Sequence, residues 1–251
     1  MNKKVLDFYR FTFKNFKQGM VNYILTGDYE KNKYTVVPEK GLVYFHIPKV
    51  ATSSIVESIT GVGAKDDYMV HTLAKAVNSL TETEENYFKF SFVRNPFERL
   101  VSCYESKYHE DRKHLRVLTY LTYDYYLLGY MKNDQGFEHF IHKVCSLPDG
   151  LRDLHVKSQY RILCDKKGRL RVNYVGKYED LENDYRVIKE KYSVEPLPHF
   201  NKSKHRDWKD YYTLESAQLV YNTYRLDFEK FGYKKLYYEL IRYIKKGICH
   251  S

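Results

Sequence analysis

A lysine and three hydroxyl side chains lie between an apolar run and an amphipathic run in the segment YFHIPKVATSSIVESI, residues 44–59. The backbone N–H groups at a helix N-terminus and the positive end of the helix dipole bind phosphate groups. Lys49 adds a positive charge there, and three hydroxyl groups add donors, those of Thr52, Ser53 and Ser54. The segment suits a diphosphate-like ligand, although it has neither glycine of the loop G-x-x-x-x-G-K-[ST]. Taken alone, these residues are explained equally well by a capped helix and a solvated lysine.

A second group of phosphate-binding side chains occurs in FVRNPFERLVSCY, residues 92–104. Arg94 ends an apolar run, and Arg99 and Ser102 lie about one turn apart on the helix that we expect to follow. Arg94 and Ser102 are suited to hold a separate phosphate, because arginine donates charge-assisted hydrogen bonds to its oxygens. Arg99 either shares this role or forms an ion pair. A ligand that is anionic at two such places is adenosine 3′-phosphate 5′-phosphosulfate (PAPS).

Both segments follow apolar runs that are typical of strands buried in a parallel sheet. Three strand-then-helix units are expected, with strands in GLVYFHI, YFKFSFVR and RVNYVGKYEDL, residues 41–47, 87–94 and 171–181. Asn95 can cap the helix after the second strand, and Pro96 suits its first turn. Ligands bind beyond the carboxyl ends of such strands, where Lys49, Arg94 and Glu179 emerge. The sequence therefore predicts an α/β fold, a central parallel sheet flanked by helices with one P-loop-like nucleotide site.

Length and spacing predict a single domain at residues 41–235, with a helical extension at 1–40 and a basic tail at 236–251. The extension has apolar residues at helical spacing, and it either packs against the core or lies on a membrane surface. The segment GFEHFIHKV is expected to be a helix with a core-facing stripe, formed by Phe137, Phe140, Ile141 and Val144.

The net charge of +10 indicates anionic partners. Basic residues are dispersed along the chain without a nucleic-acid-binding signature, so no nucleic-acid partner is expected. The cysteines show neither a C-x-x-C pair nor zinc spacing and are expected to be reduced thiols without a metal: Cys103, Cys145, Cys164 and Cys249. No apolar run approaches the ~20 residues that span a bilayer, and the N-terminus lacks the pattern of a signal peptide.

These motifs resemble those of the carbohydrate sulfotransferases. HIPKVATSS is similar to the family's 5′-phosphosulfate loop, and FVRNPFERLVSCY to its 3′-phosphate motif. The branch with the chondroitin and dermatan sulfotransferases is the most similar, and heparan 2-O-sulfotransferase is more distant. Ser53 stands where that branch usually has threonine, which keeps a hydroxyl. Weaker motifs such as DLHVKSQYRIL, VNYVGKYEDL and YRLDFEKFGY extend the resemblance from about residue 42 to 233.

The resemblance implies a role for each matched residue. Lys49 would contact the bridging oxygen of the phosphosulfate and stabilise the departing phosphate, and Arg94 and Ser102 would hold the 3′-phosphate. The 5′ group would be cradled by Val50, Ala51, Thr52, Ser53 and Ser54. The segment NKSKHRDWKDYYT resembles a late loop that closes over the nucleotide, with candidates Lys202, Ser203, Lys204 and Arg206. Eukaryotic members carry a membrane anchor and a stem, which this chain lacks, so the resemblance implies a bacterial, cytoplasmic member.

Sulfuryl transfer needs a base that takes the proton of the attacking hydroxyl, and imidazole suits that role at neutral pH. The resemblance to heparan 2-O-sulfotransferase favours His71, which stands 23 residues before Arg94. His155, in DLHVKSQ, is the alternative base or an acceptor contact. His46 is expected to be buried and hydrogen-bonded. Glu179 either orients a base, binds the acceptor or is structural.

The resulting hypothesis is a sulfotransferase that moves the sulfuryl group of PAPS to a hydroxyl of a carbohydrate or glycolipid acceptor without a metal. Two alternatives are an atypical nucleotide-dependent kinase and a basic nucleic-acid-binding protein. A family member that binds without catalysis is a third, which the presence of Lys49, Arg94 and Ser102 disfavours. Capsular polysaccharide, lipopolysaccharide, a glycolipid and a small metabolite all remain possible acceptors.

Overall fold

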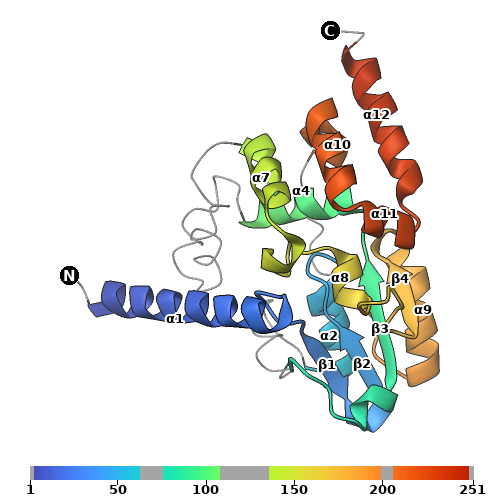
Figure 1. Ribbon diagram of the computed structural model, residues 1–251. Coiled ribbons are helices and arrows are strands. Elements are labelled where there is room, and N and C mark those ends of the chain that lie inside the picture. The colour runs from blue at the N-terminus through green and yellow to red at the C-terminus, as the bar shows by residue number, and fades with distance from the viewer. Residues whose placement is uncertain (1–2, 63–75, 108–135, 199–205, 249–251) are drawn as a thin grey trace. The chain divides into compact units, whose positions relative to one another are not determined.

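The structure is a computed structural model of the chain, and it describes residues 3–62, 76–107, 136–198 and 206–248 (Figure 1). The chain forms two compact units. The first, which we call the sheet unit, comprises residues 32–95 and 158–204. The second, the helical unit, comprises residues 1–31, 96–157 and 205–251. Among the described helices, none combines the length and the apolar character needed to cross a membrane.

The sheet unit contains a four-stranded sheet in the order β1-β2-β3-β4 (Figure 1). Its strands are β1 Tyr34–Val37, β2 Leu42–Phe45, β3 Phe88–Val93 and β4 Tyr174–Lys177. Strands β2, β3 and β4 run parallel, whereas β1 is antiparallel to β2. The predicted α/β class and the three predicted parallel strands are confirmed.

The antiparallel strand β1 was not predicted, because residues 1–40 were expected to be helical. The extension is helical over α1, Lys3–Thr26, and then forms the hairpin of β1 and β2. The short helix Pro38–Lys40 connects these two strands, and Gly41 ends it with a φ of 58°, a left-handed conformation that suits glycine. The strand YTVV follows residues with apolar side chains at helical spacing, and the prediction extended that helical segment over the whole of residues 1–40.

Aromatic side chains fill the core of the sheet unit. Phe90 and Phe92 alternate along β3 and so share one face, where Phe90 packs on Tyr44 and Phe92 on Tyr185. Gly176 of β4 lies against Phe92, and a Cβ atom there would be 2.3 Å from a ring carbon. Among the described residues, the unit's α-helices are α2 Thr52–Thr60, α8 Gln159–Leu163 and α9 Leu181–Tyr192.

The helical unit contains α1, α4, α7, α10, α11 and α12. Beyond α1, their bounds are Pro96–Lys107, Gly136–Ser146, Leu214–Thr223, Arg225–Lys230 and Lys234–Ile248. The apolar stripe predicted on α7 is buried as expected. Phe97, at the start of α4, contacts the rings of Tyr212 and Phe228 and is fully buried. Helix α4 begins at Pro96, as the sequence predicted.

Candidate active site

The loop between β2 and α2 has two non-glycine residues in the left-handed backbone region. Lys49 has a φ of 76° and Ala51 a φ of 62°, with Val50 between them. Alternation of left-handed and ordinary residues turns successive N–H groups toward one concavity, which is a common anion-binding arrangement. Each such L-residue costs roughly 1–2 kcal/mol. The loop therefore has the geometry of a phosphate-binding loop without the glycines that usually relieve its strain.

Contacts around the loop hold it in this conformation. Val50 is fully buried. The hydroxyl of Thr52 donates to the main-chain oxygen of Ile47 at 2.5 Å, and the hydroxyl of Tyr44 lies 3.3 Å from the same Thr52 oxygen. Burial raises the pKa of Tyr44 far above its usual value, so this hydroxyl stays protonated. Because its own hydrogen is directed to Ile47, Thr52 contributes to an anion site through its backbone N–H.

The N-terminus of α2 presents backbone donors at the same loop. Ala51 is the N-cap residue and makes no side-chain cap, and the first intrahelical bond runs from the N–H of Ile55 to the oxygen of Ala51. The preceding N–H groups, those of residues 52–54, precede the helical ladder and have no acceptor within it. Ser54 is buried and Ser53 is partly exposed. The donors at this N-terminus are therefore main-chain groups, and the cradle predicted for the 5′ group stays a prediction.

Arg94 contacts this loop directly. Its Nη1 atom donates to the main-chain oxygen of Lys49 at 3.0 Å, and its guanidinium carbon lies 4.1 Å from the centre of the Tyr178 ring. The side chain is only 4 % exposed. The two segments that the sequence singled out therefore meet at the carboxyl ends of β2 and β3.

Sequence reasoning missed Gln159, the first residue of α8. Its side-chain oxygen accepts from the N–H of Arg94, and its side-chain nitrogen donates to the oxygen of Arg94, both at 2.8 Å. Glu179 binds the main chain of the next residue, because its carboxylate accepts from the N–H of Asn95 at 2.6 Å. This contact gives Glu179 a structural role, and its other two predicted roles stay predictions. These long-range pairs leave no periodic signal in the sequence.

On α4 of the helical unit, Ser102 is buried and Arg99 is almost fully buried. The guanidinium of Arg99 donates to the main-chain oxygens of Leu154 and Lys157, each at 2.8 Å. Arg99 therefore binds main-chain carbonyls, and its share in a phosphate site stays a prediction. The prediction that Arg94 and Ser102 hold one phosphate stays a prediction, since the two residues belong to different units.

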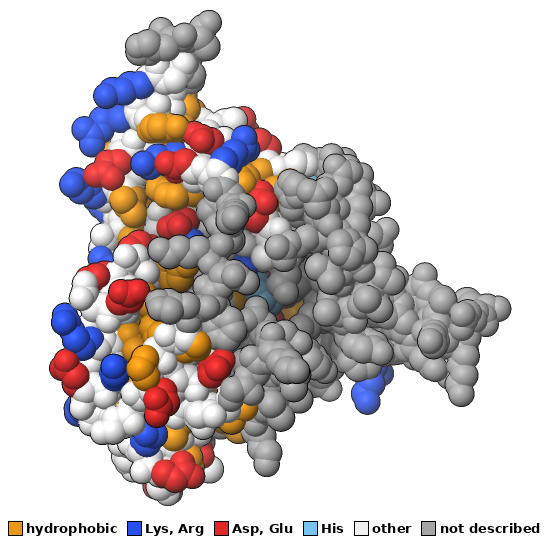
Figure 2. All heavy atoms as spheres, turned by 180° about the vertical axis from the view of Figure 1, so that it is seen from behind, with side chains coloured by type: hydrophobic (Ala, Val, Ile, Leu, Met, Phe, Trp, Pro, Cys, Tyr) orange, Lys and Arg blue, Asp and Glu red, His pale blue; other side chains and the backbone are white. Residues whose placement is uncertain are grey.

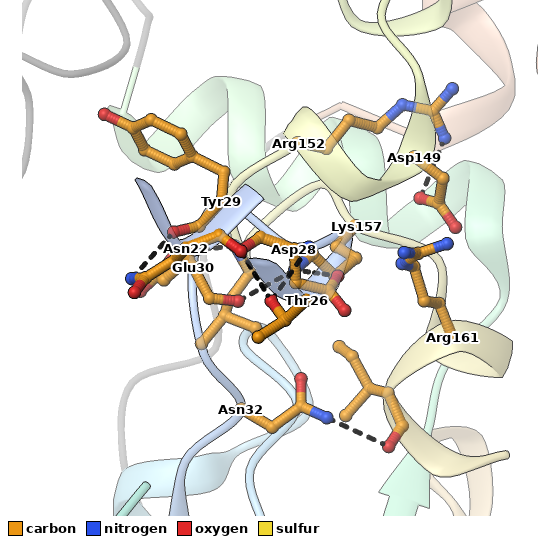
Figure 3. A network of polar contacts seen from close by, with 12 residues as sticks. Asn22, Thr26, Asp28, Tyr29, Glu30, Asn32, Asp149, Arg152, Lys157 and Arg161 are labelled. Carbon is orange, nitrogen blue, oxygen red and sulfur yellow. Dashed lines mark hydrogen bonds and ion pairs between the residues drawn. The ribbon is translucent and has the colours of Figure 1, made fainter. Parts of the chain in front are cut away.

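His155 lies in a firmly held segment of the helical unit. Its Nδ1 atom is 3.0 Å from the carboxylate of Asp153, and its side chain is 21 % exposed. Two residues further, the buried ammonium of Lys157 donates to the carboxylate of Asp28 and to the main-chain oxygen of Glu30, both at 2.9 Å (Figure 3). Together with Arg99, these contacts fix the main chain on both sides of His155.

The remaining predicted residues are distributed as follows. His46 is buried, with its Nε2 atom 2.7 Å from the hydroxyl of Thr35, as predicted. Arg206 is exposed and lies over the Tyr211 ring. His71 and the late-loop candidates Lys202, Ser203 and Lys204 lie outside the described residues. Within the described ranges, no group of three His, Cys, Asp or Glu side chains is placed to hold a metal.

The sequence is similar to a family model and to several curated proteins. A family model described as "Sulfotransferase family" matches residues 32–234. Carbohydrate sulfotransferase 14 of Danio rerio is 28% identical over 225 residues, which are 78% of this chain and 60% of that protein. Carbohydrate sulfotransferase 11 of Mus musculus is 29% identical over 242 residues, which are 80% of this chain and 67% of that protein. Carbohydrate sulfotransferase 10 of Xenopus laevis is 25% identical over 177 residues, 61% and 49% of the two chains.

The chain thus spans between about half and two thirds of these relatives' lengths. No solved structure matches it. The family model covers the loop with Lys49, the motif with Arg94 and the segment with His155, and it extends over most of the sequence. The chain belongs to the sulfotransferase family.

Proposed function

We propose that this protein transfers the sulfuryl group of PAPS to a hydroxyl of a carbohydrate acceptor. The observation that carries the proposal is the strained loop at Lys49 and Ala51, whose main-chain donors lie at the end of β2 and whose Lys49 oxygen is bound by Arg94. One anion-binding loop and one arginine, in contact with each other, suit a nucleotide that is anionic at both its 5′ and its 3′ position. The names of the vertebrate relatives support a carbohydrate as the acceptor.

In this mechanism, the acceptor oxygen attacks sulfur in line with the bond to the 5′-phosphate. The new S–O bond forms as the bond to the bridging oxygen breaks, and the hydroxyl proton passes to a base. Lys49 and the N–H groups of residues 50–54 stabilise the charge that grows on the departing phosphate. Adenosine 3′,5′-bisphosphate and the sulfated carbohydrate are the products.

Two histidines are candidates for the base. His71 is favoured by the resemblance to heparan 2-O-sulfotransferase. His155 is supported by its pairing with Asp153, because a carboxylate 3.0 Å from Nδ1 orients the ring and stabilises it when it accepts a proton. Turnover of His71→Ala and His155→Ala separates the two, because only the variant that lacks the base loses its rate across the neutral pH range.

The first test is binding, measured by titration calorimetry with adenosine 3′,5′-bisphosphate and with ATP plus magnesium. We expect the bisphosphate to bind and ATP to bind more weakly. A clear preference for ATP would support the kinase alternative and contradict the proposal. The second test is transfer of labelled sulfate to a panel of glycans and glycolipids, with Lys49→Ala as the inactive variant and the exposed helix residue Lys189→Ala as its matched control.

A nucleic-acid-binding role is less well supported. On the face drawn in Figure 2, the Lys and Arg side chains of the described residues are interspersed with Asp and Glu rather than gathered in one stripe. Nucleic-acid-binding proteins concentrate positive charge on one surface. Binding of single-stranded oligonucleotides without any response to the bisphosphate would favour that role instead. The cytoplasmic location stays a prediction, which cell fractionation of the source organism would test. The bacterial origin stays a prediction as well.

A further inference from the structure

The side-chain amide of Gln159 forms the two hydrogen bonds with the main chain of Arg94 that a residue of a neighbouring strand would form. Strand β3 ends at Val93, whose partner on β4 is Lys177, and Arg94 is the next residue. The amide of Gln159 engages the N–H and the oxygen of Arg94, each at 2.8 Å, and is itself fully buried. Ser158 caps the short helix that begins with Gln159, since its hydroxyl accepts from the N–H of Arg161. Gln159 thus fixes the main chain of Arg94 where the sheet no longer does so.

The side chain of Arg94 is fixed from two further directions. The Tyr178 ring lies against the guanidinium at 4.1 Å, an arrangement that stabilises a cation over an aromatic face. The Nη1 atom donates to the main-chain oxygen of Lys49 at 3.0 Å. A guanidinium carries five N–H donors in a planar fork, so one donor can hold a carbonyl while the group also serves an anion.

The contact with Lys49 orients a donor of the loop. A trans peptide is planar, and its C=O and N–H bonds point in opposite directions. When Arg94 holds the oxygen of Lys49, the N–H of Val50 in the same peptide points away from Arg94. Lys49 has a φ of 76°, a conformation that an L-residue keeps only when its surroundings enforce it. Arg94 is one of the contacts that enforce it.

We infer that Gln159 is a positioning residue that acts through Arg94 to set the geometry of the Lys49 loop, so that the 3′ and 5′ ends of the nucleotide site are coupled. The inference rests on the proposed function. It differs from the simpler expectation that Arg94 serves the 3′-phosphate alone. Under that expectation, substitutions of Arg94 and Gln159 do not change the affinity for a ligand that lacks a 3′-phosphate. Under the inference, both substitutions lower that affinity.

The test compares adenosine 3′,5′-bisphosphate with adenosine 5′-phosphate by titration calorimetry. Gln159→Met keeps the size of the side chain and removes both hydrogen bonds. We expect the affinity for each ligand to fall by at least about tenfold, or about 1.4 kcal/mol of binding free energy, because the Arg94 main chain and the Lys49 loop are no longer held in the binding geometry. Arg94→Ala is also expected to lower the affinity for both ligands, and the loss of affinity should be larger for the bisphosphate. If 5′-phosphate affinity is unchanged in both variants, the inference is wrong.

Two further measurements separate positioning from general destabilisation. Tyr185→Phe removes a different buried hydrogen bond of the sheet unit, the one to Ser58, and is expected to leave both affinities unchanged. In the Arg94→Ala background, Gln159→Met is expected to add little, because it acts through Arg94. Fully additive losses would overturn the inference.

If Gln159→Met does not fold, Gln159→Asn replaces it, because the shorter amide withdraws both groups from the Arg94 main chain without burying a charge. The expected result is a loss that is shared by both ligands, and a loss confined to the bisphosphate would contradict the coupling. Failure of the wild type to bind either nucleotide would instead refute the proposed function.

Discussion

The Nη1 atom of Arg94 lies 3.0 Å from the main-chain oxygen of Lys49, although 45 residues separate the two along the chain. This hydrogen bond joins the two segments that sequence analysis assigned to opposite ends of one nucleotide. Parallel strands bring their carboxyl ends to one edge of a sheet, and here the resulting proximity is a direct contact. The following predictions test the site and the scaffold around it.

Lys49→Ala is expected to reduce turnover by at least about a hundredfold, because the departing phosphate loses its point charge. The substitution keeps a Cβ atom in the same left-handed conformation, so the melting temperature should stay close to that of the wild type. Initial rates with saturating donor and thermal melts measure the two effects. Near-normal turnover in a folded variant would remove Lys49 from the mechanism.

Ala51→Gly and Ala51→Val test the left-handed backbone of the loop. Glycine adopts a φ of 62° without steric cost, so Ala51→Gly should keep both stability and bisphosphate binding. A β-branched residue is strongly disfavoured there, and Ala51→Val should lower the unfolding free energy by about 1–3 kcal/mol and abolish binding. Chemical denaturation and calorimetry give the two readouts. Equal tolerance of both substitutions would contradict the observed conformation.

Arg99→Ala and Arg94→Ala are expected to have different effects. Arg99→Ala leaves two buried carbonyls without their donor, and we expect it to destabilise the helical unit by about 2–4 kcal/mol. Arg94→Ala should mainly weaken bisphosphate binding. Thermal melts and calorimetry on both variants check this division. A normal melting temperature together with lost 3′-phosphate recognition in Arg99→Ala would instead assign Arg99 to the ligand.

Tyr178→Phe and Tyr178→Leu distinguish the contribution of the Tyr178 ring to bisphosphate binding from that of its hydroxyl. The phenyl ring retains the face over which the Arg94 guanidinium lies, whereas leucine removes it. A cation–π contact contributes about 0.5–2 kcal/mol, so Tyr178→Leu should weaken the bisphosphate by about two- to thirtyfold and Tyr178→Phe by much less. Equal losses in the two variants would show that the hydroxyl, not the ring, is responsible.

Gly176→Ala is expected to destabilise the sheet unit, because its Cβ atom would lie 2.3 Å from a carbon of the Phe92 ring. The displacement of a fully buried aromatic side chain costs about 1–3 kcal/mol. Gly247→Ala is the matched control, since open space surrounds its Cβ position and it lies in α12, where alanine is favoured over glycine. Urea denaturation should show a loss for the first variant and no loss for the second.

The sequence predicted those parts of the fold that have local signals. Apolar runs located β2 and β3, the strand-then-helix pattern located β4, and helical spacing located the buried stripe of α7. Motif resemblance located the loop at Lys49 and the segment at Arg94. The strand β1 was missed because the helical spacing of the preceding residues was extended over the whole of residues 1–40.

The roles of Gln159, Tyr178 and Arg99 could not be predicted, for a different physical reason. Each depends on a partner that is distant in sequence, such as the Arg94 main chain or the carbonyls of Leu154 and Lys157. A polar side chain in the sequence does not indicate which backbone groups the fold will bring to it. The left-handed conformation of Lys49 and Ala51 was equally hidden, because neither residue is the glycine that normally marks it.

The absence of glycine from the Lys49 loop has a consequence for ligand capture. Glycine gives a loop more conformational freedom than other residues do, so a loop without glycine has less freedom to lose when its anion binds. A smaller entropy of ordering is therefore subtracted from the binding free energy. We expect fast association with little conformational adjustment, a rate governed by diffusion and by attraction to a chain of net charge +10, and hence a rate that declines as ionic strength rises.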